Sequence, residues 1–105
     1  MTTLKHQEND SLYSYIQIPN GFTPDGDGTN DFYNVTAFSL AEYELKISNA
    51  SGELVYVTQI LHPQHGWYGD HKGVKAASGK YFYHLWAKDY TGFEYDHNGE
   101  IYLVK

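Results

Sequence analysis

The stretch from Lys80 to Lys88, KYFYHLWAK, decides the fold class of this chain. Two sets of side chains alternate along it: one holds Tyr83, Leu85 and Ala87, and the other holds Phe82, His84 and Trp86. A period of two is typical of a β-strand, because successive side chains point to opposite faces of a sheet. The turn residues Asp-Tyr-Thr-Gly follow at positions 89–92. The sequence therefore predicts a long strand that ends in a tight connection.

Six further runs of strand type lie on either side of this one, separated by turn residues: 12–18, 32–35, 43–48, 53–60, 93–96 and 99–104. Asn98-Gly99 is the predicted tight turn between the last two runs. Leu40–Glu44 is the only segment whose sequence is compatible with a helical turn. About seven short strands predict an all-β, immunoglobulin-like antiparallel β-sandwich without the cysteine pair of that fold, since the chain has no cysteine.

Length and net charge limit the number of domains and the classes of function that this chain could have. The 105 residues fit one domain, and the net charge of −6 disfavours nucleic acid, whose phosphates need a basic surface. No apolar run reaches the roughly 20 residues of a transmembrane helix. The polar residues 1–11 are interpreted as a linker or an added remnant, and residues 12–105 as the folded domain.

A glycine-rich acidic loop is the candidate metal site. Asp25, Asp27 and Asp31 occupy relative positions 1, 3 and 7 of the loop, and glycine lets alternate side chains converge. Oxygen ligands at this spacing suit calcium. Asn30 and a backbone carbonyl near Thr29 would complete a structural calcium site. The alternative is a metal-free turn that is stabilised by its own Asx hydrogen bonds.

Aromatic residues give a candidate partner surface. If Tyr83 and its set face the core, then Phe82, His84 and Trp86 form an outer stripe that a partner would contact. The alternatives are a strand buried on both faces, or a stripe covered by a neighbouring loop. Trp67 is interpreted as a packing anchor for its long loop, with a sugar-binding platform as the other interpretation.

Three segments, in order and spacing, resemble one known family: 18–32, which contains NGFTPDGDGTNDF; 45–56, LKISNASGELVY; and 66–83, which opens with GWYGD and ends with SGKYFY, followed by the closing strand at 99–105. The chain resembles the gliding-motility-associated C-terminal domain, the type B sorting domain of the type IX secretion system, from Ile18 to Lys105. It departs from the family at Asp25, at Ala50-Ser51 and at Tyr68, where Asn, Arg-Trp and Asp are common.

The resemblance implies that the domain is a sorting signal without catalytic activity. Such domains sit at the C-terminus of large secreted or cell-surface proteins and direct them through the outer membrane, with the secretion machinery and a cognate outer-membrane protein as partners. The alternative function is a carbohydrate-binding β-sandwich, with Trp67, Tyr68 and Trp86 as sugar platforms. An enzyme is disfavoured, because no nucleophile elbow and no phosphate-binding loop occurs in the sequence.

Overall fold

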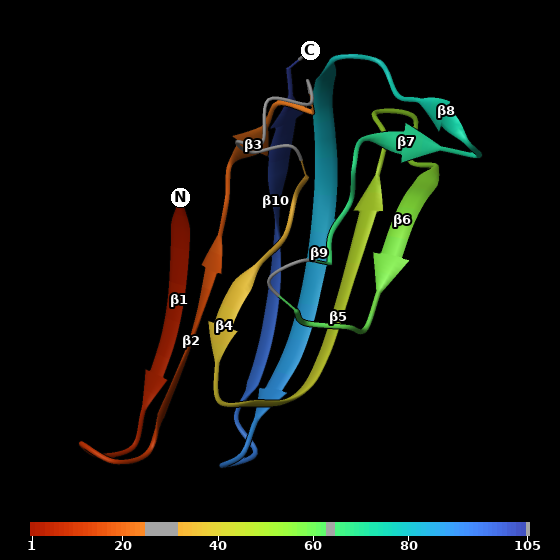
Figure 1. Cartoon of the computed structure of the whole chain (residues 1–105). Helices are drawn as coiled ribbons and strands as arrows, with labels where there is room; N and C mark the ends of the chain where they lie inside the picture. The colour runs from red at the N-terminus through yellow and green to blue at the C-terminus, as the bar shows by residue number, and fades with distance from the viewer. Residues whose placement is uncertain (25–31, 63–64, 105) are drawn as a thin grey trace.

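The computed structural model describes residues 1–24, 32–62 and 65–104, and within them the chain forms strands and no helix (Figure 1). Ten strands lie in this described part: β1 Thr2–Gln7, β2 Tyr13–Ile18, β3 Gly21–Phe22, β4 Thr36–Phe38, β5 Leu40–Ser48, β6 Leu54–Thr58, β7 Asp70–His71, β8 Val74–Lys75, β9 Gly79–Asp89 and β10 Glu94–Leu103. The predicted all-β class is confirmed.

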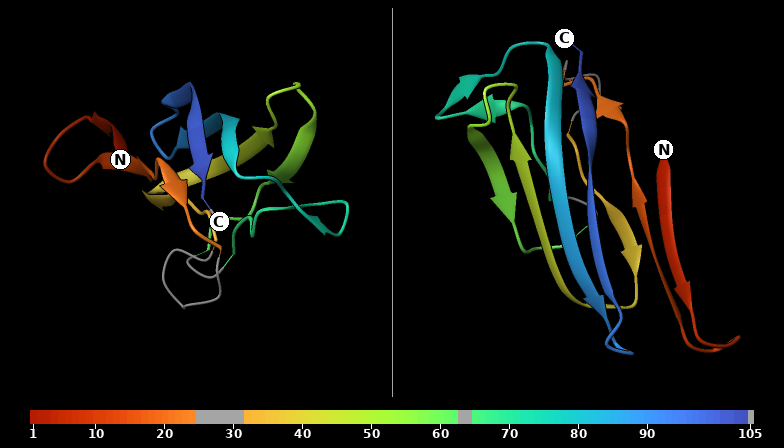
Figure 2. Two further views of the ribbon diagram at one scale, coloured as in Figure 1. Left: turned by 90° about the horizontal axis from the view of Figure 1, so that it is seen from above. Right: turned by 180° about the vertical axis from the view of Figure 1, so that it is seen from behind.

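Two sheets form the sandwich. One has the order β1-β2-β4 and the other has the order β3-β10-β9-β5-β6. Their long strands run along the long axis of the molecule, as the views in Figures 1 and 2 show. The small hairpin β7–β8 stands beside β6 at one end of the molecule.

Strand β9 is the centre of the larger sheet. It pairs antiparallel with β5 on one side and with β10 on the other, with Leu85 opposite Leu45 and His97. Its burial alternates as the sequence predicts, because Tyr83, Leu85 and Ala87 are buried. These side chains join one core with residues from both sheets, including Ile16 and Ile18 of β2, Ile47 of β5 and Ile101 of β10.

Strand β3 departs from the antiparallel pattern. Gly21 and Phe22 pair parallel with Tyr102 and Leu103 of β10. A side chain at position 21 would overlap the carbonyl oxygen of Tyr102, so only glycine allows this close approach. The short parallel pairing joins the chain leaving β2 to the larger sheet.

The predicted turn at Asn98-Gly99 is wrong, because β10 is continuous from Glu94 to Leu103. Gly99 lies opposite Tyr83, and a Cβ at this position would overlap the tyrosine ring. Glycine here serves cross-strand packing instead of a turn. The helical alternative for Leu40–Glu44 is also wrong, since these residues begin β5.

Residues 1–11 differ from the expected linker. Thr2–Gln7 forms β1 and pairs with Ile18–Tyr13 of β2 in a six-residue antiparallel register. Its alternate residues Thr2, Leu4 and His6 are half-buried, and the His6 ring stacks on Phe93 with centroids 3.9 Å apart. Polar residues hid this alternation in the sequence. The division of the chain at residue 11 stays a prediction.

Candidate interaction surface

The predicted aromatic stripe lies on the outer face of the larger sheet. Phe82, His84 and Trp86 alternate with the buried residues of β9, and no described segment buries them. Phe82 is 41% exposed, and the His84 side chain is also 41% exposed. Within the described part of the structure the stripe faces outward, with Phe82 exposed and with His84 and Trp86 half-buried.

Carboxylates of β10 hold two of these rings in place. The Trp86 indole Nε1 donates a hydrogen bond to Glu94 Oε1 at 3.0 Å, and His84 Nε2 lies 2.8 Å from Asp96 Oδ1. Both acidic residues are exposed, and lysines lie on the same face, with Lys88 opposite Glu94 and Lys46 opposite His84. The surface therefore offers aromatic contact area bordered by charges of both signs, which suits a partner with a polar rim.

Glu94 and Asp96 were missed in the sequence. Their role follows from the β9–β10 register, in which Lys88 faces Glu94 and Trp86 faces Asp96. The turn residues at 89–92 are the signal from which this register could have been predicted, because they connect β9 directly to β10. The erroneous turn at Asn98-Gly99 concealed it, because it divided β10 into two short strands.

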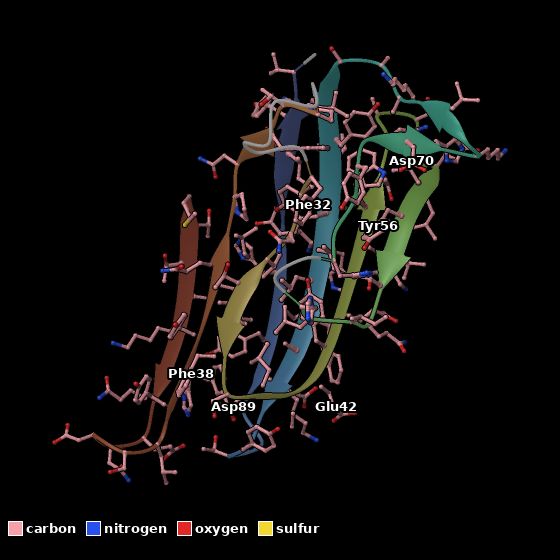
Figure 3. The ribbon with its side chains drawn as sticks, in the orientation of Figure 1. Phe32, Phe38, Glu42, Tyr56, Asp70 and Asp89 are labelled. Carbon is pink, nitrogen blue, oxygen red and sulfur yellow. The ribbon has the colours of Figure 1, made fainter. Side chains whose placement is uncertain are left out.

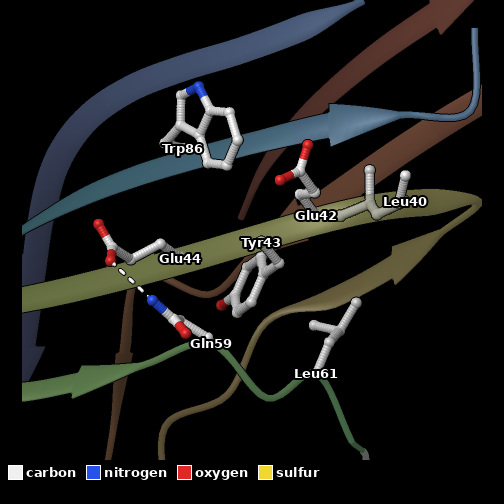
Figure 4. Close-up of a pocket in the computed structure, with 8 residues that line it drawn as sticks. Leu40, Glu42, Tyr43, Glu44, Gln59, Leu61 and Trp86 are labelled. Carbon is white, nitrogen blue, oxygen red and sulfur yellow. Dashed lines mark hydrogen bonds between the residues drawn. The ribbon is translucent and has the colours of Figure 1, made fainter. Parts of the chain in front are cut away.

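A groove opens at one end of this face (Figure 4). Its volume is about 520 Å³, and it lies between the first half of β5, the chain after β6, and Trp86. Glu42 and Glu44 are its charged lining residues, and Gln59 Nε2 donates a hydrogen bond to Glu44 Oε2 at 3.2 Å. Tyr43 also lines the groove, and its burial, followed by the charge of the nearby Tyr56, raises the pKa of its phenol above the ordinary value.

A buried polar cluster lies near the same end of the molecule, where Figure 3 labels Asp89 and Glu42. Asp89 Oδ2 accepts a hydrogen bond from Ser14 Oγ at 2.7 Å, and Ser14 Oγ also lies 2.6 Å from the Tyr95 hydroxyl. Asp89 Oδ1 accepts hydrogen bonds from Thr91 Oγ1 and from the backbone N–H groups of Thr91 and Phe93. This cluster joins the two sheets and closes the β9–β10 turn.

The predicted calcium ligands Asp25, Asp27, Thr29, Asn30 and Asp31 lie outside the described residues. The segments that flank them are anchored. Phe22 and Tyr33 are buried, and Tyr33 and Trp67 exchange two backbone hydrogen bonds of 2.7 and 2.9 Å. Within the described residues, no group of three acidic, histidine or cysteine side chains is arranged to hold a metal ion.

Trp67 is a packing residue. Its side chain is 1% exposed, its Nε1 donates to the Asp70 carbonyl oxygen at 2.8 Å, and its ring meets Tyr81 edge-on. A buried ring cannot stack on a sugar, so the carbohydrate interpretation loses one of its three platforms. Tyr68 is exposed but stacks on Phe32.

A second cluster links the β7–β8 hairpin to the turn before β6. Glu53 Oε2 lies 3.4 Å from His71 Nε2 and 3.5 Å from Lys72 Nζ. The charge of His71, followed by that of Lys72, lowers the pKa of the Glu53 carboxyl. Both Glu53 and Lys72 are solvent-exposed, so this contact orients the hairpin and contributes little stability.

The comparisons with known proteins give one match. The family model described as the CHU_C type IX secretion signal domain matches residues 16–103, which extends from β2 to the end of β10. No curated protein and no solved structure matches the chain. The described part of the chain contains no helix that is long and apolar enough to cross a membrane.

Proposed function

The chain belongs to the type IX secretion signal domain family. From this membership we propose that it is a non-catalytic sorting signal that directs its parent protein through the outer membrane. The observation that carries the proposal is the extent of the match, which runs through both sheets of the sandwich. We infer that the folded part within residues 16–103 is the signal and that the secretion machinery recognises its surface. We assign it to the type B group, which implies a cognate outer-membrane partner and a destination at the cell surface or outside the cell.

The aromatic stripe is the proposed docking surface for that partner. Phe82 offers exposed apolar area and the half-buried Trp86 adds part of its ring, while the carboxylates of Glu94 and Asp96 fix the orientation of the Trp86 and His84 rings. Large aromatic residues commonly dominate the binding energy of protein interfaces. Removal of these side chains from the outer face leaves the core intact, because the core residues of β9 point the other way.

Export of a reporter tests both statements. Residues 1–105, which include β1, fused to a secreted reporter protein that carries an N-terminal export signal should leave a host cell that has the matching secretion system. Deletion of Gly99–Lys105 should abolish export, because it removes the buried Ile101 and Leu103 with the second half of β10. Retention of the intact fusion within the cell would contradict the sorting function.

A second pair of fusions separates recognition from folding. Phe82→Ser combined with Trp86→Ser should lower the exported fraction at least about tenfold, as expected for two lost aromatic contacts. Tyr90→Ser is the matched control, since Tyr90 is 75% exposed on the β9–β10 turn, away from the stripe. Circular dichroism should show a native fold for both. Equal export of the two variants would exclude the stripe as the docking surface and leave the sorting function unchanged.

A further inference from the structure

Part of the edge of β5 has no strand beside it in the described structure. On one side, β9 pairs with β5 from Leu40 to Ser48. On the other side, β6 pairs only with Leu45–Ser48, because it ends at Thr58 opposite Leu45. The backbone of Leu40–Glu44 on that side therefore offers its N–H and C=O groups to an added strand.

A local hydrogen bond explains why β6 stops there. The Thr58 hydroxyl accepts a hydrogen bond from the Ile60 backbone N–H at 3.0 Å and lies 2.9 Å from His65 Nε2. Such a bond favours a turn over continued pairing. Leu61 then packs against the core and leads the chain away from β5. The groove of about 520 Å³ lies between this departing chain and the open edge.

The charge of the groove indicates what would bind there. Glu42 and Glu44 are two residues apart on one strand, so their carboxylates share the outer face with Trp86, which lies opposite Glu44. Figure 4 shows Trp86 above the β5 ribbon beside Glu42 and Glu44. The lining contains no cation, and although Lys88 of β9 lies opposite Glu42, Glu42 makes no ion pair within the described residues. Lys46 approaches Glu44 only from outside the groove, at 3.6 Å.

We propose that the Leu40–Glu44 edge binds an extended basic segment of a partner protein, which adds a short strand in line with β6. Basic side chains at alternate positions of that segment would face Glu42 and Glu44, since opposite charges across a strand pair attract. The Trp86 ring offers a face for one of the cations. The register shift between Leu40 and Glu42 limits the added strand to a few residues.

A second copy of this chain fits the edge poorly. Antiparallel pairing of two such edges would place carboxylates of Glu42 and Glu44 opposite those of the other copy, and like charges directly opposite are destabilising. The same carboxylates that reject self-association attract a basic strand. This inference adds a binding site to the proposed sorting role and does not need that role to hold.

The probe is a synthetic peptide of about seven residues in which arginine alternates with valine, a length typical of one strand. Titrated into the isotopically labelled chain, it should shift the backbone amide resonances of residues 40–44 and 59–61. A peptide with glutamate in place of arginine should not bind. A peptide with alternate backbone nitrogens methylated should also fail, because it cannot complete the ladder of hydrogen bonds.

Charge reversal completes the test. Glu42→Lys combined with Glu44→Lys should weaken binding of the arginine peptide at least about fivefold, as expected for two lost cross-strand charge pairs. Asp10→Lys is the control, because it makes the same kind of charge change in the β1–β2 turn. Shifts elsewhere on the molecule, equal binding of the methylated peptide, or no binding at millimolar concentration would overturn the proposal. Dimerisation of the double variant without peptide binding would show that the carboxylates only protect the edge.

Discussion

At the scale of single residues, Asp89 carries the most concentrated set of interactions. The side chain is buried, which by itself would raise its pKa, but hydrogen bonds from Thr91, Ser14 and the backbone of Thr91 and Phe93 outweigh burial and lower the pKa to about 2. These hydrogen bonds favour the ionised carboxylate. The charge of Asp89 therefore links the stability of the fold to pH.

Asp89→Asn tests this link. The amide cannot accept all the hydrogen bonds of the carboxylate, so we expect the free energy of unfolding at pH 7 to fall by about 1–3 kcal/mol. A lowered folded-state pKa stabilises the protein above the ordinary pKa of 3.8, and this stabilisation is lost as the pH falls toward about 2. Urea unfolding should therefore show a difference between the two proteins that shrinks below about pH 4.

Asp10→Asn is the control for that measurement, since Asp10 is exposed in the β1–β2 turn. Its effect on the free energy of unfolding should stay within roughly 0.5 kcal/mol. A difference between the native protein and the Asp89→Asn variant that is the same at pH 7 and pH 2.5 would contradict the assigned charge state.

At the scale of elements, alternation in the sequence predicted more than composition did. The period of two in 80–88 fixed which residues of β9 face the core, and the run at 43–48 did the same for β5. Prediction from the sequence pattern fails where the alternating residues are polar, as in β1, or where a glycine is mistaken for a turn residue, as at Gly99. Local sequence cannot separate these cases, because the Tyr83 ring that requires Gly99 is distant in the chain.

The candidate site was predictable to a similar extent. The stripe on β9 follows from alternation alone, whereas its exposure depends on which segments cover the sheet. The open edge of β5 was not predictable, because it depends on where β6 ends. That end is set by the Thr58 hydroxyl and its contacts with Ile60 and His65, and the sequence alone does not show that these three residues meet.

The parallel β3–β10 pairing gives a prediction at this scale. Gly21→Ala should separate the two strands, because the methyl group would overlap the Tyr102 carbonyl. We expect the free energy of unfolding to fall by about 1–3 kcal/mol, the usual cost of overpacking. Hydrogen exchange should accelerate at the Tyr102 and Val104 amides, which donate to the carbonyl oxygens of Asn20 and Phe22.

Asn20→Ala is the neighbouring control, because it keeps the backbone carbonyl that accepts the Tyr102 hydrogen bond. Exchange at Tyr102 should then remain slow. If Gly21→Ala leaves both amides as protected as in the native chain, the close approach of β3 to β10 is not what requires glycine.

At the scale of the whole molecule, the chain must become stable without a disulfide, since it has no cysteine. Its core is a single cluster shared by the two sheets, and a domain of this size has limited spare stability. The net charge of −6 includes the carboxylates of the acidic loop, which would repel one another without a cation. An ion bound there would add stability where the chain passes from the buried Phe22 to the buried Tyr33.

We therefore propose that Asp25, Asp27 and Asp31 bind one structural calcium ion, with Asn30 and a carbonyl near Thr29 as further ligands. The proposal rests on the spacing of the carboxylates in the sequence. A ligand that binds only the folded state stabilises it by about 2.7 kcal/mol at a hundredfold its dissociation constant. For a domain of this length, millimolar calcium should raise the melting temperature by roughly 10 °C over excess chelator. Magnesium should substitute poorly, because it demands an octahedral site.

Asp27→Ala should remove most of the calcium-dependent shift in melting temperature, because it removes the middle one of the three proposed carboxylate ligands. Asp10→Ala removes one negative charge outside the loop and should keep the full shift, which separates ligand loss from a general effect of charge. Thermal unfolding followed by circular dichroism measures both. Melting curves of the native chain that coincide in calcium and in chelator would refute the site and favour the metal-free alternative.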